Sequence, residues 1–194
     1  MFSIILPSYL GEYKDSATNK ESKLHRAIES VLNQTVKEYE LIVVSDGCEK
    51  TIEIASQYDI NIYKINKQSI MSGVPRQTGI KQATQDWIIY IDSDDCWGKE
   101  HLQKISDGMC CNWQWFYFND WVWNGSDWEE RKCNIRVKGN CGTANIVHKR
   151  SLPVKWGDGY LHDWRFIQQL HKYQGKRIDE SEYFVCHIPK KFDV

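Results

Sequence analysis

The chain has 194 residues, 41% of them hydrophobic, and a formal net charge of −1. This length suits one domain with a sizeable core and is short for two, so we expect a single domain over residues 1–194. The charge gives no electrostatic reason to expect nucleic acid or an anionic membrane as a partner, and no apolar run approaches the ~20 residues of a transmembrane helix.

The first expected element is a buried strand over residues 2–6, which is followed by Pro7. Proline has no N–H group for a central ladder, so we expect the strand to end there. Ser8 and Tyr9 then lie at its carboxyl end, which is the side on which open α/β sheets bind ligands.

A helix and a second strand follow. Thr18 and Glu21 have the spacing of a capping box, and the apolar residues after them recur at helical spacing: Leu24, Ala27, Ile28, Val31 and Leu32. Residues 39–45 form a near-continuous apolar run, typical of a parallel strand that is buried on both faces. Asp46 follows this strand and either caps the next helix, over residues 49–58, or faces a ligand.

Two further strands, over residues 60–65 and 87–91, continue a strand–helix alternation. The alternation predicts an α/β fold with a Rossmann-like, doubly wound, mostly parallel sheet flanked by helices. Pro75 and Arg76 lie at the amino end of the intervening helix. Because a cation is disfavoured beside the positive end of a helix dipole, we expect Arg76 to have an anionic partner.

The strand over residues 87–91 runs into three carboxylates, Asp92, Asp94 and Asp95. Carboxylates this close repel one another unless a cation lies among them, and hard oxygen ligands suit Mg²⁺ or Mn²⁺. A solvated turn is the alternative. The position at the carboxyl end of a strand favours a metal site.

The second half of the chain is rich in aromatic residues. A strand over residues 113–123 meets Asn124 and Gly125, the commonest signal for a hairpin turn, and we expect the return strand over residues 128–137. Most of the tryptophans are expected to serve packing rather than sugar binding. The other elements expected here are a helix over residues 99–109 and strands over residues 143–148 and 182–186.

The motifs of the first half are, in order, Ile4–Tyr9, Ala27–Thr35, Glu40–Gly47, Arg76–Gly79 and Ile91–Asp95. In this order and spacing they resemble the nucleotide-binding half of family 2 glycosyltransferases, which have the GT-A fold. The resemblance implies one GT-A domain, with residues 1–98 as the nucleotide-binding half. Residues 99–194, with a small β-hairpin region, would be the acceptor-binding half. The chain departs from the pattern at Ser45, where many members have aspartate, and at Gln77, where many have asparagine.

The resemblance further implies a metal-dependent, inverting transfer of a hexose-type sugar from a UDP-sugar to a hydroxyl of a glycan or small-molecule acceptor, with Mn²⁺ or Mg²⁺ as cofactor. Nucleotide contacts would fall on Pro7, Ser8, Tyr9, Asp46, Arg76, Asp92 and Ser93, and metal coordination on Asp94 and Asp92. His187 follows the last expected strand, where some relatives have a metal-binding histidine. It is a further candidate ligand, although a lone histidine is more often structural.

Residues 157–166 form a second polar cluster, which leads into a helix. Asp163 lies in the first turn, where an acidic residue compensates the helix dipole. The segment also resembles the family's Glu-Asp motif, in which the aspartate is the general base, with His162 in place of the glutamate. We therefore expect Asp163 to be the catalytic base and His162 and Trp164 to be acceptor contacts.

Seven cysteines, with no Cys-x-x-Cys pair and no recognisable secretion signal, predict reduced thiols in a cytoplasmic protein. Two other classes of function stay open. A non-catalytic nucleotide-sugar or glycan-binding module would keep Asp46 but need no base, and His162 favours it. A sugar nucleotidyltransferase would usually have a glycine-rich, basic loop after the first strand, which residues 7–12 lack.

Overall fold

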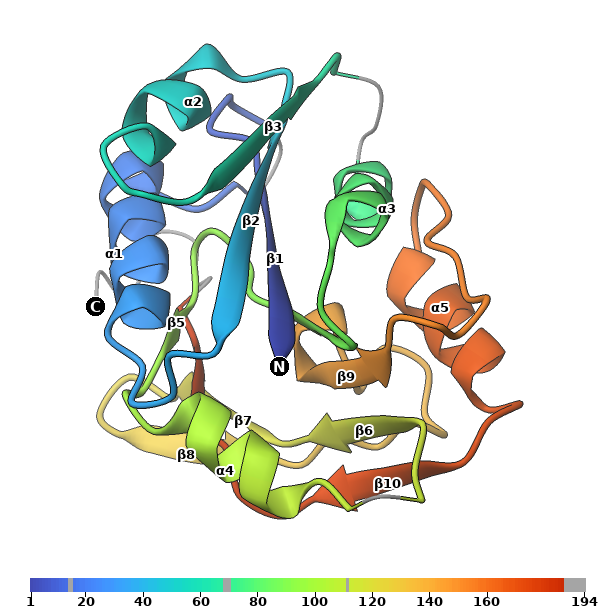
Figure 1. Ribbon diagram of the computed structural model, residues 1–194. Coiled ribbons are helices and arrows are strands. Elements are labelled where there is room, and N and C mark those ends of the chain that lie inside the picture. Colours follow the sequence, from blue (N-terminus) through green and yellow to red (C-terminus); the bar gives the residue numbers. More distant parts are fainter. Residues whose placement is uncertain (14–15, 68–70, 111, 187–194) are drawn as a thin grey trace.

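Strands β1 (Phe2–Ser8), β2 (Tyr39–Asp46), β3 (Asn61–Ile65) and β4 (Trp87–Tyr90) form the parallel half of a seven-stranded sheet (Figure 1). The computed structural model describes residues 1–13, 16–67, 71–110 and 112–186, and in this part of the chain the strand order is β10-β6-β9-β4-β1-β2-β3. Strand β9 (Ile146–Lys149) runs antiparallel to β4 and to β6 (Trp115–Phe118), and β10 (Gly175–Ile178) is parallel to β6. The predicted α/β fold with a mostly parallel central sheet is confirmed.

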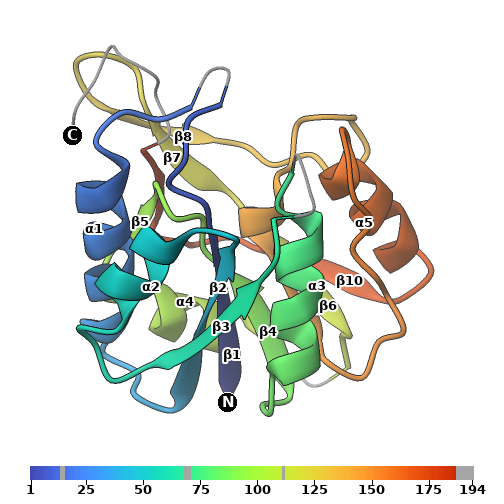
Figure 2. The same ribbon diagram turned by 90° about the horizontal axis from the view of Figure 1, so that it is seen from above.

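The sheet separates two hydrophobic cores because successive side chains of a strand point to opposite faces. In β1, Ile4 and Leu6 face one core and Ile5 faces the other, and β2 and β4 repeat this alternation. Helices α1 (Lys20–Leu32), α2 (Glu49–Ala55) and α4 (His101–Gly108) cover the first face, and α3 (Gly73–Gln82) and α5 (His162–Leu170) cover the second (Figures 1 and 2). The central strands are therefore buried on both faces, as their apolar runs predict.

Strand β1 continues through Pro7 to Ser8, so the expectation that proline ends it is wrong. Pairing of β1 with β4 stops at Ile5, whereas pairing with β2 continues to Ser8. The carbonyl of Ile5 accepts a hydrogen bond from the N–H of Ile91 on the β4 side. Pro7, two residues further on, faces the same side beyond the last pair, so its missing N–H costs no ladder hydrogen bond.

The capping box expected at Thr18 is absent, and of the two roles considered for Asp46 the helix cap is excluded. Helix α1 starts after Asn19, a residue with left-handed backbone (φ 51°) and no side-chain capping bond, so Thr18 does not occupy the cap position. Helix α2 starts after Cys48 and not after Asp46. The hydroxyl of Ser45 secures this turn, since it donates to the Cys48 carbonyl at 2.7 Å and accepts from the Cys48 N–H at 3.1 Å.

A second, four-stranded sheet has the order β5 (Cys96–Trp97), β11 (Tyr183–Val185), β7 (Asp120–Trp123) and β8 (Trp128–Arg131). The predicted hairpin is confirmed, since β7 and β8 pair antiparallel around Asn124, but the return strand ends at Arg131. The strand expected over residues 143–148 is a 3₁₀ turn, η1 (Thr143–Asn145), followed by β9.

The aromatic segment forms two strands in two sheets, not the single strand expected. Asn119, between β6 and β7, is buried at the crossing. Its side chain donates to Glu130 at 2.8 Å and accepts from the N–H of Cys133 at 3.0 Å, and its carbonyl accepts from the hydroxyl of Ser181. The bond from Ser181 satisfies the Asn119 backbone carbonyl where the chain changes sheets, and the two side-chain bonds tie Asn119 to β8 and to Cys133.

Cys133 and Cys141 form a disulfide, so the expectation of reduced thiols is wrong for this pair. The chain turns back after β8 and brings the two Cα atoms to 4.9 Å. The sequence gives no sign of the pairing, because it depends on this turn. The other four described cysteines are free.

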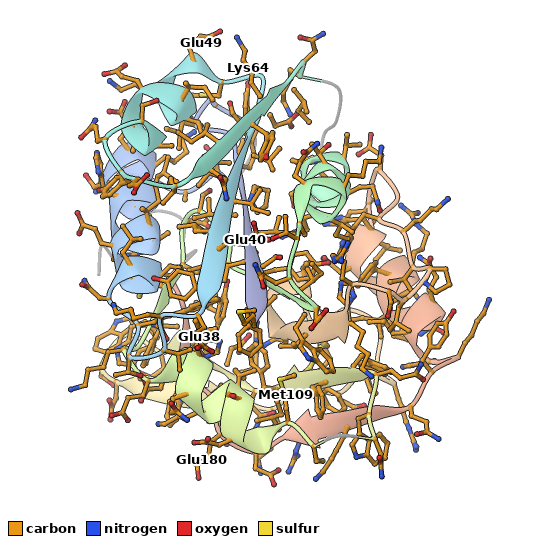
Figure 3. All side chains as sticks on the ribbon, in the orientation of Figure 1. Glu38, Glu40, Glu49, Lys64, Met109 and Glu180 are labelled. Atoms are coloured by element: carbon orange, nitrogen blue, oxygen red, sulfur yellow. A yellow bond between two sulfur atoms is a disulfide. The ribbon has the colours of Figure 1, made fainter. Side chains whose placement is uncertain are left out.

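The amino ends of the strands are fixed by Glu40 of β2, which Figure 3 labels. Its carboxylate accepts hydrogen bonds from Ser3 of β1 at 2.5 Å and from the N–H and hydroxyl of Thr84 at 2.6 and 2.9 Å. This end of the sheet is closed by polar contacts, which leaves ligand binding to the carboxyl end. Among the described residues, no helix is long and apolar enough to cross a membrane.

Candidate active site

A cavity of about 660 Å³ lies at the carboxyl ends of the parallel strands and extends to β7, η1 and α5. Ten of the residues predicted from the sequence line it: Pro7, Ser8, Tyr9, Asp46, Arg76, Asp92, Ser93, Asp94, His162 and Asp163. Trp164, the other predicted acceptor contact, is half-buried in α5 and does not line the cavity. His187 lies outside the described residues.

Asp46 lies at one end of this cavity and is buried. Its Oδ2 accepts a hydrogen bond from Lys67 Nζ at 2.6 Å, and the same ammonium group is 4.3 Å from the ring centroid of Tyr9. Ser8 shares a hydrogen bond of 3.0 Å with Thr51 of α2. This end of the cavity therefore offers a carboxylate acceptor, an aromatic face and a cation.

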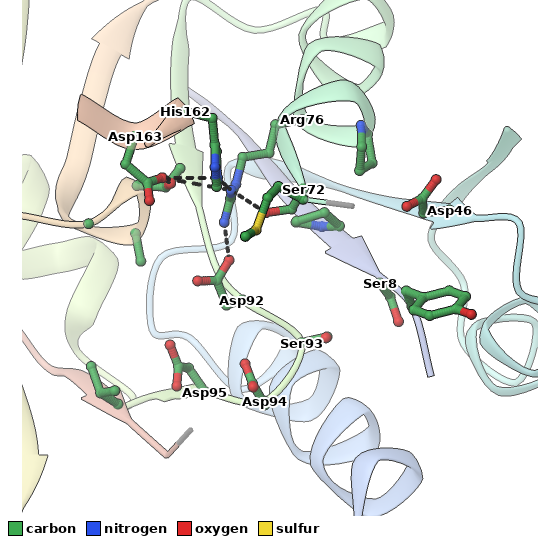
Figure 4. A pocket seen from close by; sticks show the side chains of 18 of the residues that line it. Ser8, Asp46, Ser72, Arg76, Asp92, Ser93, Asp94, Asp95, His162 and Asp163 are labelled. Atoms are coloured by element: carbon green, nitrogen blue, oxygen red, sulfur yellow. Dashed lines mark hydrogen bonds and ion pairs between the residues drawn. The ribbon is translucent and has the colours of Figure 1, made fainter. Parts of the chain in front are cut away.

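Arg76 of α3 is buried between the two ends of the cavity, with Asp46 and Ser8 on one side and His162 and Asp163 on the other (Figure 4). Its Nη2 donates to Asp92 Oδ1, and its Nη1 lies 3.0 Å from His162 Nε2 and 3.9 Å from Asp163 Oδ1. Burial disfavours the charge, but the two carboxylates more than offset it and raise the pKa of Arg76. The anionic partner predicted for Arg76 is confirmed as Asp92.

Three buried rings, those of Trp156, Tyr90 and His148, are linked by hydrogen bonds, and the ring of Trp156 packs beside Arg76. The guanidinium carbon is 5.3 Å from the ring centroid of Trp156, whose Nε1 donates to the Tyr90 hydroxyl at 3.0 Å. Burial lowers the pKa of His148 to about 4, so this imidazole is neutral near pH 7. Its Nδ1 donates to the Lys149 carbonyl at 3.0 Å, so its Nε2 accepts from the Tyr90 hydroxyl at 2.7 Å. Trp156, Tyr90 and His148 thus form a hydrogen-bonded series in which each polar side-chain group has a partner. This series fixes the position of the Trp156 ring beside the guanidinium.

Asp163 lies in the first turn of α5, and its side chain is 35% exposed. Its Oδ1 accepts a hydrogen bond from the hydroxyl of Thr143 and lies 3.2 Å from His162 Nε2. Burial raises the pKa of Asp163, although Arg76 and His162 act in the opposite sense. A carboxylate with a raised pKa that reaches a cavity can accept a proton from a hydroxyl group there.

The three aspartates after β4 differ in their surroundings. Asp95 is buried and accepts hydrogen bonds of 2.7 Å from the hydroxyl of Tyr183 and from the N–H of Cys186. Burial, followed by the charges of Asp94 and Asp92, raises the pKa of Asp95 well above its usual value. All three aspartates line the cavity, but both carboxylate oxygens of Asp95 accept hydrogen bonds from the protein.

The residues present fit a hard divalent cation that binds together with a ligand. Within residues 1–13, 16–67, 71–110 and 112–186, no group of three His, Cys, Asp or Glu side chains could hold a metal ion. Mg²⁺-type ions usually bind through one or two carboxylates plus phosphate oxygens and water. Asp92 and Asp94 offer two carboxylates on the cavity and so meet this requirement.

Lys67, Ser72 and Thr143 line the cavity without having been predicted. Lys67 follows β3 by two residues, so the strand-end argument that selects Asp46 could have found it. Ser72 is the residue before α3, and its hydroxyl accepts from Arg76 Nη1. Thr143 has no local signal, because the long-range fold alone brings η1 beside Asp163.

The model of the family "Glycosyl transferase family 2" matches residues 3–161 of the chain. The poly(ribitol-phosphate) beta-N-acetylglucosaminyltransferase TarP of Staphylococcus aureus (strain N315) is 33% identical over 110 residues, which are 53% of this chain and 31% of TarP. Glycosyltransferase GlyA of Streptococcus pneumoniae serotype 4 is 25% identical over 206 residues, which cover 93% of this chain and 27% of GlyA. The chain thus spans less than a third of the length of these two relatives.

Two solved structures show the same fold. S. aureus TarS 1–349 in complex with UDP-GlcNAc superposes with a TM-score of 0.77 at 18% identity, over 95% of this chain and 58% of that one. The mannosyltransferase PcManGT from Pyrobaculum calidifontis, in complex with GDP-Man and Mn²⁺, superposes with a TM-score of 0.66 at 12% identity, over 98% of this chain and 57% of that one. The predicted GT-A fold is confirmed.

Proposed function

Because this chain belongs to glycosyl transferase family 2, we propose that it transfers a hexose-type sugar from a UDP-sugar to an acceptor hydroxyl, with inversion at the anomeric carbon. One observation carries the proposal: a single cavity joins the polar end around Asp46 to the half-exposed carboxylate of Asp163, with Arg76 between them. The complex of TarS with UDP-GlcNAc supports a UDP-sugar as the donor.

The donor nucleotide would bind at the Asp46 end. The buried carboxylate would accept a hydrogen bond from the imide N–H of uracil, while the ring of Tyr9 packs on the base. Lys67 lies between these two side chains and would bring positive charge near the nucleotide. Further contacts would come from the other nucleotide residues that line this end: Pro7, Ser8, Asp92 and Ser93.

The chemical step would take place at the Asp163 end. Asp163 would accept the proton of the acceptor hydroxyl while the hydroxyl oxygen forms a bond to the anomeric carbon from the face opposite UDP. The bond between the anomeric carbon and the diphosphate oxygen breaks, and its electron pair leaves with UDP. Arg76, buried beside Asp92, would stabilise the charge that develops on the leaving diphosphate.

Asp94 and Asp92 would hold Mn²⁺ or Mg²⁺, which when bound supplies Lewis-acid stabilisation of the diphosphate charge. The complex of PcManGT with Mn²⁺ supports this choice of cofactor. Residues 1–98 would then be the nucleotide-binding half and residues 99–194 the acceptor-binding half of one domain. Both halves contribute to the cavity lining, which supports this division.

The direct test is to incubate the protein with UDP-GlcNAc, UDP-glucose or UDP-galactose and Mn²⁺, without an added acceptor, and to measure slow release of UDP and free sugar. A transferase hydrolyses its own donor, and chelation with EDTA should stop the release. Pyrophosphate release from UTP and a sugar 1-phosphate would instead indicate a nucleotidyltransferase. Tight UDP-sugar binding without turnover, with and without candidate acceptors, would indicate a binding module.

A further inference from the structure

The segment over residues 131–141 carries four cationic residues and no acidic one, in a chain whose net charge is −1. We call it the basic loop. Lys132, Arg136 and Lys138 are exposed, and none of them takes part in an ion pair within the described part of the chain. Such an unbalanced cluster attracts anions more strongly than scattered surface lysines do.

The basic loop has a defined conformation. The disulfide between Cys133 and Cys141 closes its base, and both cysteines are buried in a hydrophobic core. The Asn134 side chain accepts from the N–H of Arg136 at 3.0 Å, and the Asn134 N–H donates to the Asn140 side chain at 2.6 Å. The cationic side chains thus project from a pre-organised turn, which lowers the entropic cost of binding a partner.

Both ends of the basic loop lie on the cavity. At one end, Arg131 lines the cavity and donates from Nε to Asp120 at 2.8 Å. At the other end, Gly142 and Thr143 line the cavity, and Thr143 donates to Asp163. The loop therefore lies beside the part of the cavity that contains Asp163.

Arg131 is paired with Asp120, and Glu129 and Glu130 precede the loop in β8, so the positive charge of the loop that is unpaired among the described residues comes from the exposed Lys132, Arg136 and Lys138. Partial burial and then the charge of Arg136 lower the pKa of His171, at the carboxyl end of α5. Lys172 is the next residue and is also exposed, so the positive region continues from the loop onto the end of α5. By contrast, seven of the residues that line the cavity are acidic: Glu12, Asp46, Asp92, Asp94, Asp95, Asp120 and Asp163. Positive charge is thus concentrated at the rim on the acceptor side.

We propose that the basic loop binds an acceptor with repeated anionic groups while one acceptor hydroxyl reaches Asp163. This inference rests on the proposed function and specifies the acceptor class for the same site. An anionic membrane surface would also be attracted to the cations. The placement of both loop ends on the cavity favours a chain-like acceptor that continues into the site.

The test compares Arg136→Glu/Lys138→Glu with Lys81→Glu/Lys99→Glu, a control that changes the net charge equally at two exposed lysines outside the cavity lining. The probes are a short glycerol-phosphate oligomer, a neutral maltooligosaccharide of equal length, and phosphatidylglycerol vesicles. Binding is measured at low and at physiological salt, together with UDP affinity and a melting curve for each variant. We expect the parent and the control to bind the oligomer, and the loop variant to bind it about tenfold or more weakly at low salt, with UDP affinity unchanged.

Each outcome decides the proposal. Loss of oligomer affinity in the loop variant alone, weakened by salt, supports it. Binding of the neutral probe as tight as that of the oligomer, an equal loss in the control, or binding of vesicles without the oligomer would overturn it. Because UDP affinity is measured separately, a protein that binds the oligomer but not UDP would count against the proposed function and not against the anion-binding loop.

Discussion

Replacement of Asp163 by asparagine separates a catalytic role of this side chain from a structural one. Asparagine keeps the shape of the side chain and an oxygen that can accept the hydrogen bond from Thr143. It removes the negative charge and the capacity to take up a proton. Since burial already raises the pKa of Asp163, the protein environment tolerates an uncharged group there, and the variant should fold.

The expected sizes of the two effects differ strongly. Loss of a general base lowers turnover by ~10²-fold or more. In a purely structural role, Asp163 would compensate the dipole of α5 and accept the hydrogen bond from Thr143. Loss of these interactions would lower the free energy of unfolding by ~1 kcal/mol or less and leave the activity per folded molecule nearly intact. The raised pKa adds a second signature. Activity should fall as Asp163 becomes protonated. In a plot of kcat/KM against pH, this fall should occur at a higher pH than for an ordinary carboxyl group, because the pKa of Asp163 is raised. The fall should be absent from the variant.

The assay is UDP release from a UDP-sugar with Mn²⁺, with an acceptor where one is known and otherwise by background hydrolysis, alongside UDP-sugar affinity and a melting curve. The matched control is Asp158→Asn, an exposed neighbour whose carboxylate accepts only from the N–H of Gly159 among the described contacts. We expect the control to retain activity and the Asp163 variant to keep its donor affinity while losing turnover. An Asp163 variant that turns over like the parent would refute the assignment, and the base would then be sought at His162.

Three further predictions concern the nucleotide end and stability. Asp94→Ala should abolish the Mn²⁺-dependent part of UDP binding, and unchanged calorimetric affinity with and without Mn²⁺ would remove Asp94 from metal binding. Asp46→Ala should weaken UDP binding more than pyrophosphate binding, because Asp46 would contact the base; equal losses for both ligands would contradict this. Burial lowers the pKa of His101 to about 3 and that of His148 to about 4, so below pH ~6.5 the unfolded chain binds protons that the native state does not. The free energy of unfolding, from urea denaturation, should then fall by ~2 kcal/mol per histidine between pH 6.5 and 5, and a constant value would show that these imidazoles are not neutral in the native state.

The nucleotide end could be predicted from the sequence because its residues follow buried strands. Parallel strands place their carboxyl ends at one edge, so Ser8, Asp46 and Asp92, far apart in the chain, had to lie near one another. The helix-dipole argument likewise predicts an anionic partner for Arg76, and Asp92 is that partner. The same rule, applied to the end of β3, could also have identified Lys67, which was not predicted.

The acceptor end could not be predicted in the same way, because long-range contacts determine it. The change of sheet at Asn119 depends on Glu130 and Cys133, which only the folded chain brings near. The disulfide of Cys133 depends on the turn that follows β8, and the contact between Thr143 and Asp163 joins residues 20 positions apart. Hydrophobic periodicity and secondary-structure propensity describe single helices and strands. The contacts of Asn119, Cys133 and Thr143 join elements whose arrangement in space is set by the whole fold.

The departure at His162 bears on whether this site is catalytic. A glutamate there would put a third carboxylate beside Arg76, together with Asp92 and Asp163. His162 is buried, and burial lowers its pKa, which favours the neutral imidazole. Its Nε2 lies 3.0 Å from Arg76 Nη1 and 3.2 Å from Asp163 Oδ1, so the ring contacts both groups and adds no third negative charge. The histidine therefore leaves Asp92 and Asp163 as the two carboxylates beside Arg76, so its presence does not favour a non-catalytic module over a transferase.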